Sequence, residues 1–138
     1  MKLSFKTPTE KEFQQICEYI HEFELDNRVL KLPEFTAAFH KEELVGFGRL
    51  RKHSDCTELC SLGVVIPHRK QGIGKAIVEE LIHKAPHNLY LVCIIPEFFI
   101  PFRFSIVTEY PAPIKDKLQY CISELIVPET YVVMQLLE

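Results

Sequence analysis

The stretch LGVVIPHRKQGIGKAI, residues 62–77, decides the class of fold that we expect for this chain. Its first five residues, 62–66, are apolar or glycine, which is the composition of a buried strand. A basic turn follows and leads to Gly72 and Gly74. Residues 72–84 then place apolar side chains at helical spacing. A strand that runs through a glycine turn into a helix is typical of the α/β and α+β classes.

The rest of the chain carries further strand and helix patterns, without an internal repeat or a linker. Short apolar or alternating runs predict strands over Leu3–Lys6, Glu34–His40, Leu44–Arg51, Cys56–Val65, Leu89–Ile95, Ser105–Glu109 and Tyr131–Leu136. Helical spacing predicts an amphipathic helix to about Phe23 and a helix over Ile114–Ser123. A second short helix is expected around Asn27–Leu32, without a clear periodic pattern. Thr7-Pro8-Thr9-Glu10 has the form of a capping box before the first helix. These patterns predict one domain over residues 1–138, built on a mixed central sheet.

The strand predicted over Leu44–Arg51 has two further features. The polar turn Lys41-Glu42-Glu43 precedes it, which indicates a hairpin with the strand before it. Gly46 and Gly48 alternate within it, so we expect another chain segment or a ligand to pass close to its backbone.

Composition and charge exclude several classes of protein. The chain has 138 residues, 47% of them hydrophobic and 25% charged, which suits one globular domain. A net charge of −3 and a pI near 6.1 provide no basic field for nucleic acid. No apolar run reaches the roughly 18 residues of a membrane helix, and residues 1–6 lack a signal core. Five cysteines, an odd number, are expected to be reduced thiols, so we expect a cytoplasmic protein.

The glycine turn has the features of a phosphate-binding site. The first N–H groups of a helix lack intrahelical partners, and glycines let a phosphate approach the backbone closely. Arg69, Lys70 and Lys75 add positive charge to an otherwise acidic chain. A Walker loop would need glycine at position 69 and serine or threonine at position 76, which is alanine. A dinucleotide fingerprint would need a third glycine at position 77, which is isoleucine.

The spacing that does fit is Arg-x-x-Gly-x-Gly, from Arg69 to Gly74, directly after a strand. Here the sequence resembles the GNAT N-acetyltransferase superfamily, whose signature Gln/Arg-x-x-Gly-x-Gly/Ala lies between its fourth strand and third helix. Leu62-Gly63-Val64 matches the family's strand, and residues 98–107 are similar to its second motif, FYEKLGFxxV. Order and spacing agree over nearly the whole chain. The resemblance implies a twisted mixed sheet of about six or seven strands with helices on both faces.

The resemblance also implies acetyl-CoA as the co-substrate and assigns residues to it. In the family the pantetheine arm pairs with the fourth strand, so Val64 and Ile66 would offer main-chain groups. The pyrophosphate would lie on the backbone of the loop formed by Arg69, Lys70, Gln71, Gly72, Ile73, Gly74 and Lys75. Phe98, Phe99 and Phe102 would line the opposite wall. Core packing is the alternative for these aromatics, and the favoured one for Phe102.

Transfer of an acetyl group to an amine needs a base for the amine and a proton for the leaving thiolate. Glu58 lies six residues before Val64, and this even number puts both on one face of a regular strand. Some members of the superfamily have their catalytic glutamate at this offset, so Glu58 is the candidate base. The alternative is a solvated strand residue paired with Arg49 or Arg51. The tyrosine that often donates the proton in the family is replaced here by Phe99.

Tyr110 is a candidate for the missing proton donor, and Tyr120, Cys121 and water are alternatives. Cys56 and Cys60 would lie about 13 Å apart on one strand, so no metal site is expected. The acceptor is expected to be a small-molecule or peptide amine, with no nucleic-acid or membrane partner. A homodimer is one expected oligomeric state, because dimers are common in the family. An acyl-CoA-binding module without turnover and an interaction module are the alternatives to an enzyme.

Overall fold

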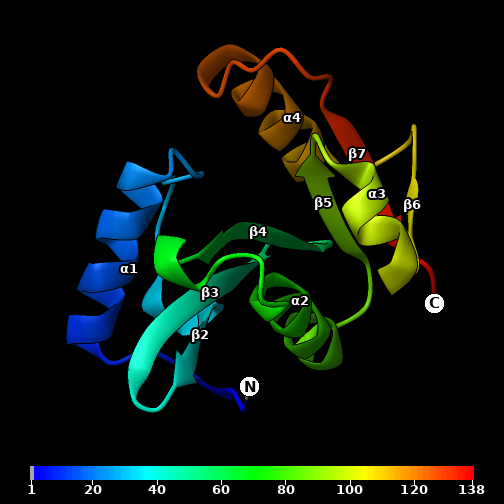
Figure 1. Ribbon diagram of the computed structural model, residues 1–138. Coiled ribbons are helices and arrows are strands. Elements are labelled where there is room, and N and C mark those ends of the chain that lie inside the picture. Colours follow the sequence, from blue (N-terminus) through cyan, green and yellow to red (C-terminus); the bar gives the residue numbers. More distant parts are fainter. Residues whose placement is uncertain (1) are drawn as a thin grey trace. The chain divides into compact units, whose positions relative to one another are not determined.

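The structure of the protein is a computed structural model that describes residues 2–138. Seven strands of this part of the chain form one mixed sheet in the order β1-β2-β3-β4-β5-β7-β6 (Figure 1). The strands are β1 (Ser4–Lys6), β2 (Phe35–His40), β3 (Glu43–Lys52), β4 (Thr57–Val64), β5 (Leu89–Cys93), β6 (Phe104–Ile106) and β7 (Val132–Leu136). The helices are α1 (Glu10–Glu22), α2 (Ile73–Lys84), α3 (Pro96–Phe99) and α4 (Ala112–Glu124). The predicted class, a mixed sheet of six or seven strands with interspersed helices, is confirmed.

The described chain divides into two compact units, one made of residues 2–50 and 59–85, the other of residues 51–58 and 86–138. In the first unit, β2 and β3 place their apolar side chains against α1. Ile16 and Ile20 of the helix and Phe47 of β3 are all fully buried in this cluster. The helical spacing that predicts α1 is thus the spacing of its buried face.

The hairpin of β2 and β3 is confirmed, and it explains two glycines. Lys41 and Glu42 form a two-residue turn with φ values of 50° and 69°, the left-handed pair typical of a tight hairpin. Gly46 and Gly48 face α2, on the side of the sheet opposite α1. A Cβ on either glycine would lie 2.6 Å from a side-chain carbon of that helix. The segment that passes close to the β3 backbone is therefore α2 and not a ligand.

The first helix begins two residues later than the sequence predicts. Thr9 is the N-cap of α1, and its hydroxyl accepts a hydrogen bond from the Glu12 amide at 3.2 Å. The Glu12 carboxylate accepts one from the Thr9 amide at 2.9 Å, and this backbone bond holds the pKa of Glu12 below its ordinary value. The capping box is thus Thr9 with Glu12, so the prediction that placed it at Thr7 to Glu10 is wrong. The predicted helix end is confirmed, because Phe23 is the C-cap.

The segment between α1 and β2 contains no α-helix, so the helix predicted around Asn27–Leu32 is wrong. A turn at Arg28 and Val29 and the short 3-10 segment η1 (Leu32–Glu34) take its place. Val29 has a φ of 48°, a left-handed conformation that a right-handed helix cannot contain.

In the second unit, the start of β4 pairs in parallel with β5 through Thr57↔Leu89 and Glu58↔Tyr90. β5 pairs antiparallel with β7, and β7 pairs antiparallel with β6. The core of this unit joins the sheet to α4 through four buried residues, Cys56, Tyr90, Ile114 and Val133. Glu58 therefore stands on a strand that is paired and covered.

Candidate functional site

The glycine loop lies in the first unit, between β4 and α2. The 3-10 segment η2 (Ile66–His68) and a turn carry the chain to Gly72, the N-cap of α2, which has a φ of 82°. The left-handed conformation explains this glycine, since a Cβ at position 72 would meet no atom within 4 Å. Within the described chain no side chain caps this helix, so its first amides are left for water or a ligand. Gly74 lies half-buried in the first turn.

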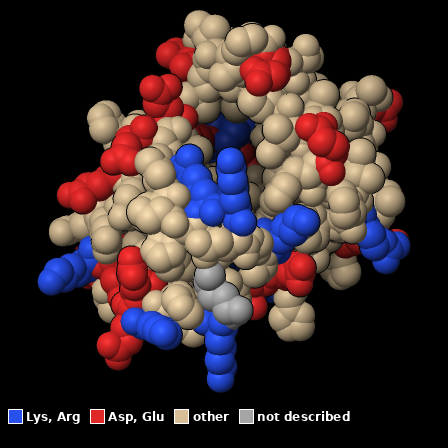
Figure 2. All heavy atoms as spheres, viewed as in Figure 1, with Lys and Arg blue, Asp and Glu red and all other residues tan. Residues whose placement is uncertain are grey.

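Exposed cations surround the loop. Arg69, Lys70 and Lys75 are all exposed, and Figure 2 shows Lys and Arg side chains gathered where Figure 1 has the turn before α2. Arg69 also has partners within the unit. Its Nε donates to the Val64 carbonyl at 2.9 Å, and its guanidinium lies 4.7 Å from the ring centroid of Phe23. Lys70 and Lys75 are therefore the cations offered to an anion, whereas Arg69 also fixes the turn.

The strand end before the loop is tied to Arg69 as well. Val64 is half-buried and Ile66 is exposed, and each carbonyl accepts a hydrogen bond from Arg69, from its side chain and from its amide respectively. Each carbonyl keeps a second lone pair. Gln71 is exposed and Ile73 is buried in the core, so Ile73 can offer a ligand only its backbone.

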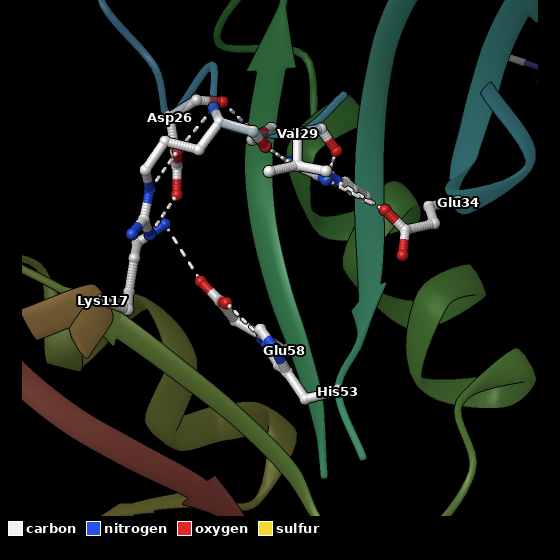
Figure 3. A network of polar contacts seen from close by, with 9 residues as sticks. Asp26, Val29, Glu34, His53, Glu58 and Lys117 are labelled. Atoms are coloured by element: carbon white, nitrogen blue, oxygen red, sulfur yellow. Dashed lines mark hydrogen bonds and ion pairs between the residues drawn. The ribbon is translucent and has the colours of Figure 1, made fainter. Parts of the chain in front are cut away.

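Glu58, the candidate base, lies in the second unit with 0% of its surface exposed. Its Oε1 is 3.0 Å from Nε2 of His53, and its Oε2 is 3.0 Å from Nζ of Lys117 (Figure 3). His53 belongs to the turn between β3 and β4, and Lys117 belongs to α4. The alternative was a solvated strand residue paired with Arg49 or Arg51. Glu58 is buried and Arg49 binds Glu34, so the solvated position and the pairing with Arg49 are both wrong.

A left-handed residue interrupts β4 between Glu58 and Val64. Ser61 has a φ of 50°, and its hydroxyl donates to the Asp26 carbonyl at 2.9 Å. Side chains alternate between the two faces only along a regular strand. An irregular residue of this kind re-aims the side chains that follow it. The even spacing between Glu58 and Val64 therefore does not put them on one face.

The two other predicted site residues lie in the second unit. Tyr110 is half-buried and packs against the core cluster that contains Cys56 and Ile114. Phe99 is buried, with ring centroids 4.9 Å from Phe98 and 5.8 Å from Phe104. The Phe99 ring is thus part of an aromatic core. A role of either residue toward a ligand stays a prediction.

Arg49 is a residue whose role sequence reasoning missed. It is fully buried, and its guanidinium donates to the carbonyls of Arg28 at 3.0 Å and Val29 at 2.6 Å. It also donates to Oε1 of Glu34 at 2.9 and 3.1 Å. These bonds fix the irregular segment between α1 and β2. One sequence signal was available. Arg49 is two residues after Phe47, so both lie on the face of β3 that packs against α1, and a charged side chain buried there must find partners.

Residues 3–97, more than half of the chain, match the family described as acetyltransferase (GNAT) family. The chain belongs to the GNAT family. A comparison with curated proteins gives no match to this GNAT chain.

Solved structures share the GNAT fold at low sequence identity. N-acetylglutamate synthase from Neisseria gonorrhoeae, complexed with coenzyme A and N-acetyl-glutamate, has a TM-score of 0.77 at 16% identity, covering 100% of this chain and 36% of that chain. The present chain thus spans about a third of that synthase's length. Rv2747 from Mycobacterium tuberculosis, in complex with CoA and NLQ, has a TM-score of 0.75 at 20% identity. The match covers 98% of this chain and 99% of that chain. Arabidopsis thaliana Naa50, in complex with the bisubstrate analogue CoA-Ac-MVNAL, has a TM-score of 0.66 at 18% identity, and the match covers 100% of both chains.

The described part of the GNAT chain contains neither a metal-binding group nor a membrane-spanning helix. Among residues 2–138, no three His, Cys, Asp or Glu side chains form a group that could hold a metal ion. In the same part of the chain no helix is long and apolar enough to cross a membrane. The Cys56 thiol, near the candidate base, is expected to be unreactive, because burial raises its pKa to about 11.

Proposed function

We propose that this GNAT protein transfers an acetyl group from acetyl-CoA to an amine. The observation that carries the proposal is the exposed loop before α2, with Gly72 in a left-handed conformation beside Lys70 and Lys75. Uncapped helix amides, an open glycine and exposed cations together suit a pyrophosphate. GNAT structures with the same fold are complexed with coenzyme A or a CoA-containing analogue, which supports this assignment.

The chain's own groups would divide the binding of acetyl-CoA between them. The amides of the loop and the two exposed lysines would hold the pyrophosphate, and Arg69 would keep the turn in shape through the Val64 carbonyl. Main-chain groups of Val64 and Ile66 would pair with the pantetheine arm. Phe99 is proposed to contact the cofactor from its aromatic core.

The reaction joins the amine nitrogen to the acetyl carbon and breaks the carbon–sulfur bond. One proton leaves the nitrogen, and the sulfur takes one up. An alkyl amine has a reference pKa of about 10.4, so proton removal needs assistance at neutral pH. We propose Glu58 for this assistance, acting through a bonded neighbour or a water because it is fully buried. Tyr110 is the proposed proton donor to sulfur, since Phe99 carries no hydroxyl.

The acceptor that we propose is a small molecule or a peptide with a free amine. Among the structural relatives, one is complexed with coenzyme A and N-acetyl-glutamate and another with the bisubstrate analogue CoA-Ac-MVNAL, which supports both classes. We further propose that the protein works in the cytoplasm, either alone or as a homodimer, without a metal.

A second candidate function is an acyl-CoA-binding module without turnover. The burial of Glu58 and the phenylalanine at position 99 favour it. Calorimetry with acetyl-CoA tests the binding that both functions share. Release of free CoA thiol with a panel of amino acids, polyamines and peptides, corrected for release without an amine, tests transfer. We expect binding and amine-dependent release; binding without release would favour the second candidate, and no binding would contradict both.

A further inference from the structure

Three ionisable side chains of the second unit form a continuous line of contacts, Lys117 to Glu58 to His53 (Figure 3). Lys117 and Glu58 are buried, whereas 14% of the His53 side chain is exposed. We propose that His53 is the base that takes the proton of the acceptor amine, that Glu58 orients the imidazole, and that Lys117 holds Glu58. The proposal rests on the proposed acetyl transfer and names the group that carries its proton.

The hydrogen bond between His53 and Glu58 fixes the position of the imidazole proton. Nε2 of His53 and Oε1 of Glu58 are 3.0 Å apart, and an ionised carboxylate can only accept hydrogen bonds. The proton between them therefore belongs to Nε2. A neutral imidazole then carries its free lone pair on Nδ1, so Nδ1 is the atom that can take a proton.

Burial decides which member of the pair meets the acceptor. Glu58 has no exposed surface, and each of its oxygens faces a charged or ionisable partner at 3.0 Å. An amine that reached this carboxylate would displace His53 or Lys117 and leave a buried charge without its partner. His53 is the member with exposed surface, so it can meet an acceptor while its bond to Glu58 stays in place.

The surrounding backbone holds these groups in a fixed arrangement. His53 lies in the turn before β4, and its amide donates to the Cys56 carbonyl at 2.9 Å. Lys117 lies on the buried side of α4, three residues after Ile114 and four before Cys121, which are both buried. A base and its orienting carboxylate need such rigid support, because loose geometry weakens proton transfer.

The other titratable groups at the site do not compete for the proton. Burial raises the pKa of the Cys56 thiol to about 11, and the charges of Asp55 and Glu58 act in the same direction. The thiol therefore stays protonated at neutral pH. Asp55 is exposed, and Lys117 is committed to the second oxygen of Glu58.

The proposed transfer forms one bond, breaks one bond and moves one proton at each end. The amine nitrogen forms its bond to the acetyl carbon, and its proton moves to Nδ1 of His53. The carbon–sulfur bond breaks, its electron pair leaves with sulfur, and the thiolate takes a proton from Tyr110 or water. The imidazolium formed on His53 faces the Glu58 carboxylate, which stabilises it because the pair is shielded from water. After the product leaves, the imidazolium releases its proton to water, and Tyr110, where it was the donor, takes a proton back from water.

The resting state of His53 can be tested without a known acceptor. NMR of ¹⁵N-labelled protein distinguishes the two neutral imidazole tautomers by the shifts of their nitrogens. We expect the Nε2–H form for His53, and a loss of this preference in Glu58→Gln, whose amide can either donate or accept. His87, which is exposed and meets Glu138 through Nδ1, is the comparison histidine in the same unit. An Nδ1–H tautomer at His53 in the wild type would overturn the proposal.

The kinetic test compares His53→Gln with His87→Gln, a change at the exposed histidine. We expect His53→Gln to lower kcat by about 10²- to 10⁴-fold at neutral pH, with unchanged affinity for acetyl-CoA. Glu58→Gln should lower kcat as well, but less than His53→Gln, because the imidazole stays in place and loses only the carboxylate that orients it. His87→Gln should behave as the wild type.

The outcomes separate this proposal from the function on which it rests. If the wild type transfers acetyl groups and His53→Gln matches its kcat, the role of His53 is overturned and acetyl transfer stands. If the wild type binds no acetyl-CoA, or binds it and acetylates no amine, acetyl transfer itself is overturned together with the role of His53.

Discussion

Arg69, Lys70 and Lys75 lie exposed around the glycine loop, whereas Arg49 and Lys117 are buried and face carboxylates. Exposed cations keep their hydration and remain available to a ligand, and they contribute little to folding. Buried cations lose their hydration and depend on the partner that the fold supplies. The two sets therefore have different functions: the first set can bind an anion, and the second fixes segments of the chain.

The largest effect is expected for the buried lysine. Lys117→Met should lower the free energy of unfolding by about 3–5 kcal/mol, because Glu58 stays buried without its ammonium partner. Urea denaturation measures this change. Lys115→Met, at an exposed position of the same helix, should stay within about 0.5 kcal/mol of the wild type.

A double variant checks the cause of that loss. Glu58→Leu combined with Lys117→Met removes both charges, and apolar pairs often replace buried ion pairs without loss of stability. The double variant should therefore be more stable than Lys117→Met alone. A Lys117→Met protein as stable as the wild type would show that the two kinds of cation do not differ in this way.

The burial around Glu58 should also be visible in the ionisation of the nearby Cys56 thiol. The pKa of Cys56 is raised from an ordinary value of 9.0 to about 11, chiefly by burial. The thiolate fraction at pH 8 should thus be about a hundredfold lower than in the unfolded chain, and alkylation of Cys56 correspondingly slower. Because the folded state holds this proton more tightly, the contribution of Cys56 to stability should fall as pH rises from about 9 to 11. Peptide mass spectrometry after timed alkylation measures the rate, and equal rates in folded and unfolded protein would contradict the burial.

A smaller loss is expected at the buried arginine. Arg49→Met removes the donors to the carbonyls of Arg28 and Val29, and it leaves Glu34 without a guanidinium. The Glu34 side chain is partly exposed, so water can replace part of the interaction, and we expect a loss of about 1–3 kcal/mol. Limited proteolysis should then cut between residues 24 and 34. Arg49→Lys keeps the positive charge but lacks the planar guanidinium, so its stability should lie between those of the wild type and Arg49→Met.

The smallest effect is expected at an exposed cation of the loop. Lys75→Ala should raise the KM for acetyl-CoA a few-fold, less at high salt, with nearly unchanged kcat and stability. Lys11→Ala, at an exposed position of α1, is the matched control and should change none of these quantities. A large fall in kcat for Lys75→Ala would show instead that this lysine acts in the reaction itself.

The sequence was sufficient to place the glycine loop between a strand and a helix, but not to identify the partners of Glu58. The loop is a local feature, because residues 69–75 and the strand and helix around them are contiguous. The partners of Glu58 come from a turn five residues away and from a helix 59 residues later, so no spacing in the sequence connects them. The regular alternation assumed for β4 also fails at Ser61, whose left-handed backbone has no clear signal in a serine.

The fold shows the same distinction between local and distant causes. Helix α2 and the hairpin of β2 and β3 follow from periodicity and turn chemistry, and both predictions are confirmed. The segment around residues 27–32 carries no such pattern, because its conformation is set by bonds from Arg49, a residue of β3. Gly46 and Gly48 of β3 predicted a close approach by another chain segment or a ligand, and the sequence does not show which; the segment is α2.

The central claim, that the exposed loop binds acetyl-CoA, is tested most directly by comparing Gly72→Asp with Gly72→Asn in calorimetry. Both side chains tolerate the left-handed conformation at φ 82° and both would project into open space, so they differ mainly in charge. We predict that acetyl-CoA binding is lost in Gly72→Asp, because a carboxylate would face the pyrophosphate, and is retained with modest weakening in Gly72→Asn. Equal affinity of the two folded variants and the wild type would contradict the assignment of this loop to acetyl-CoA.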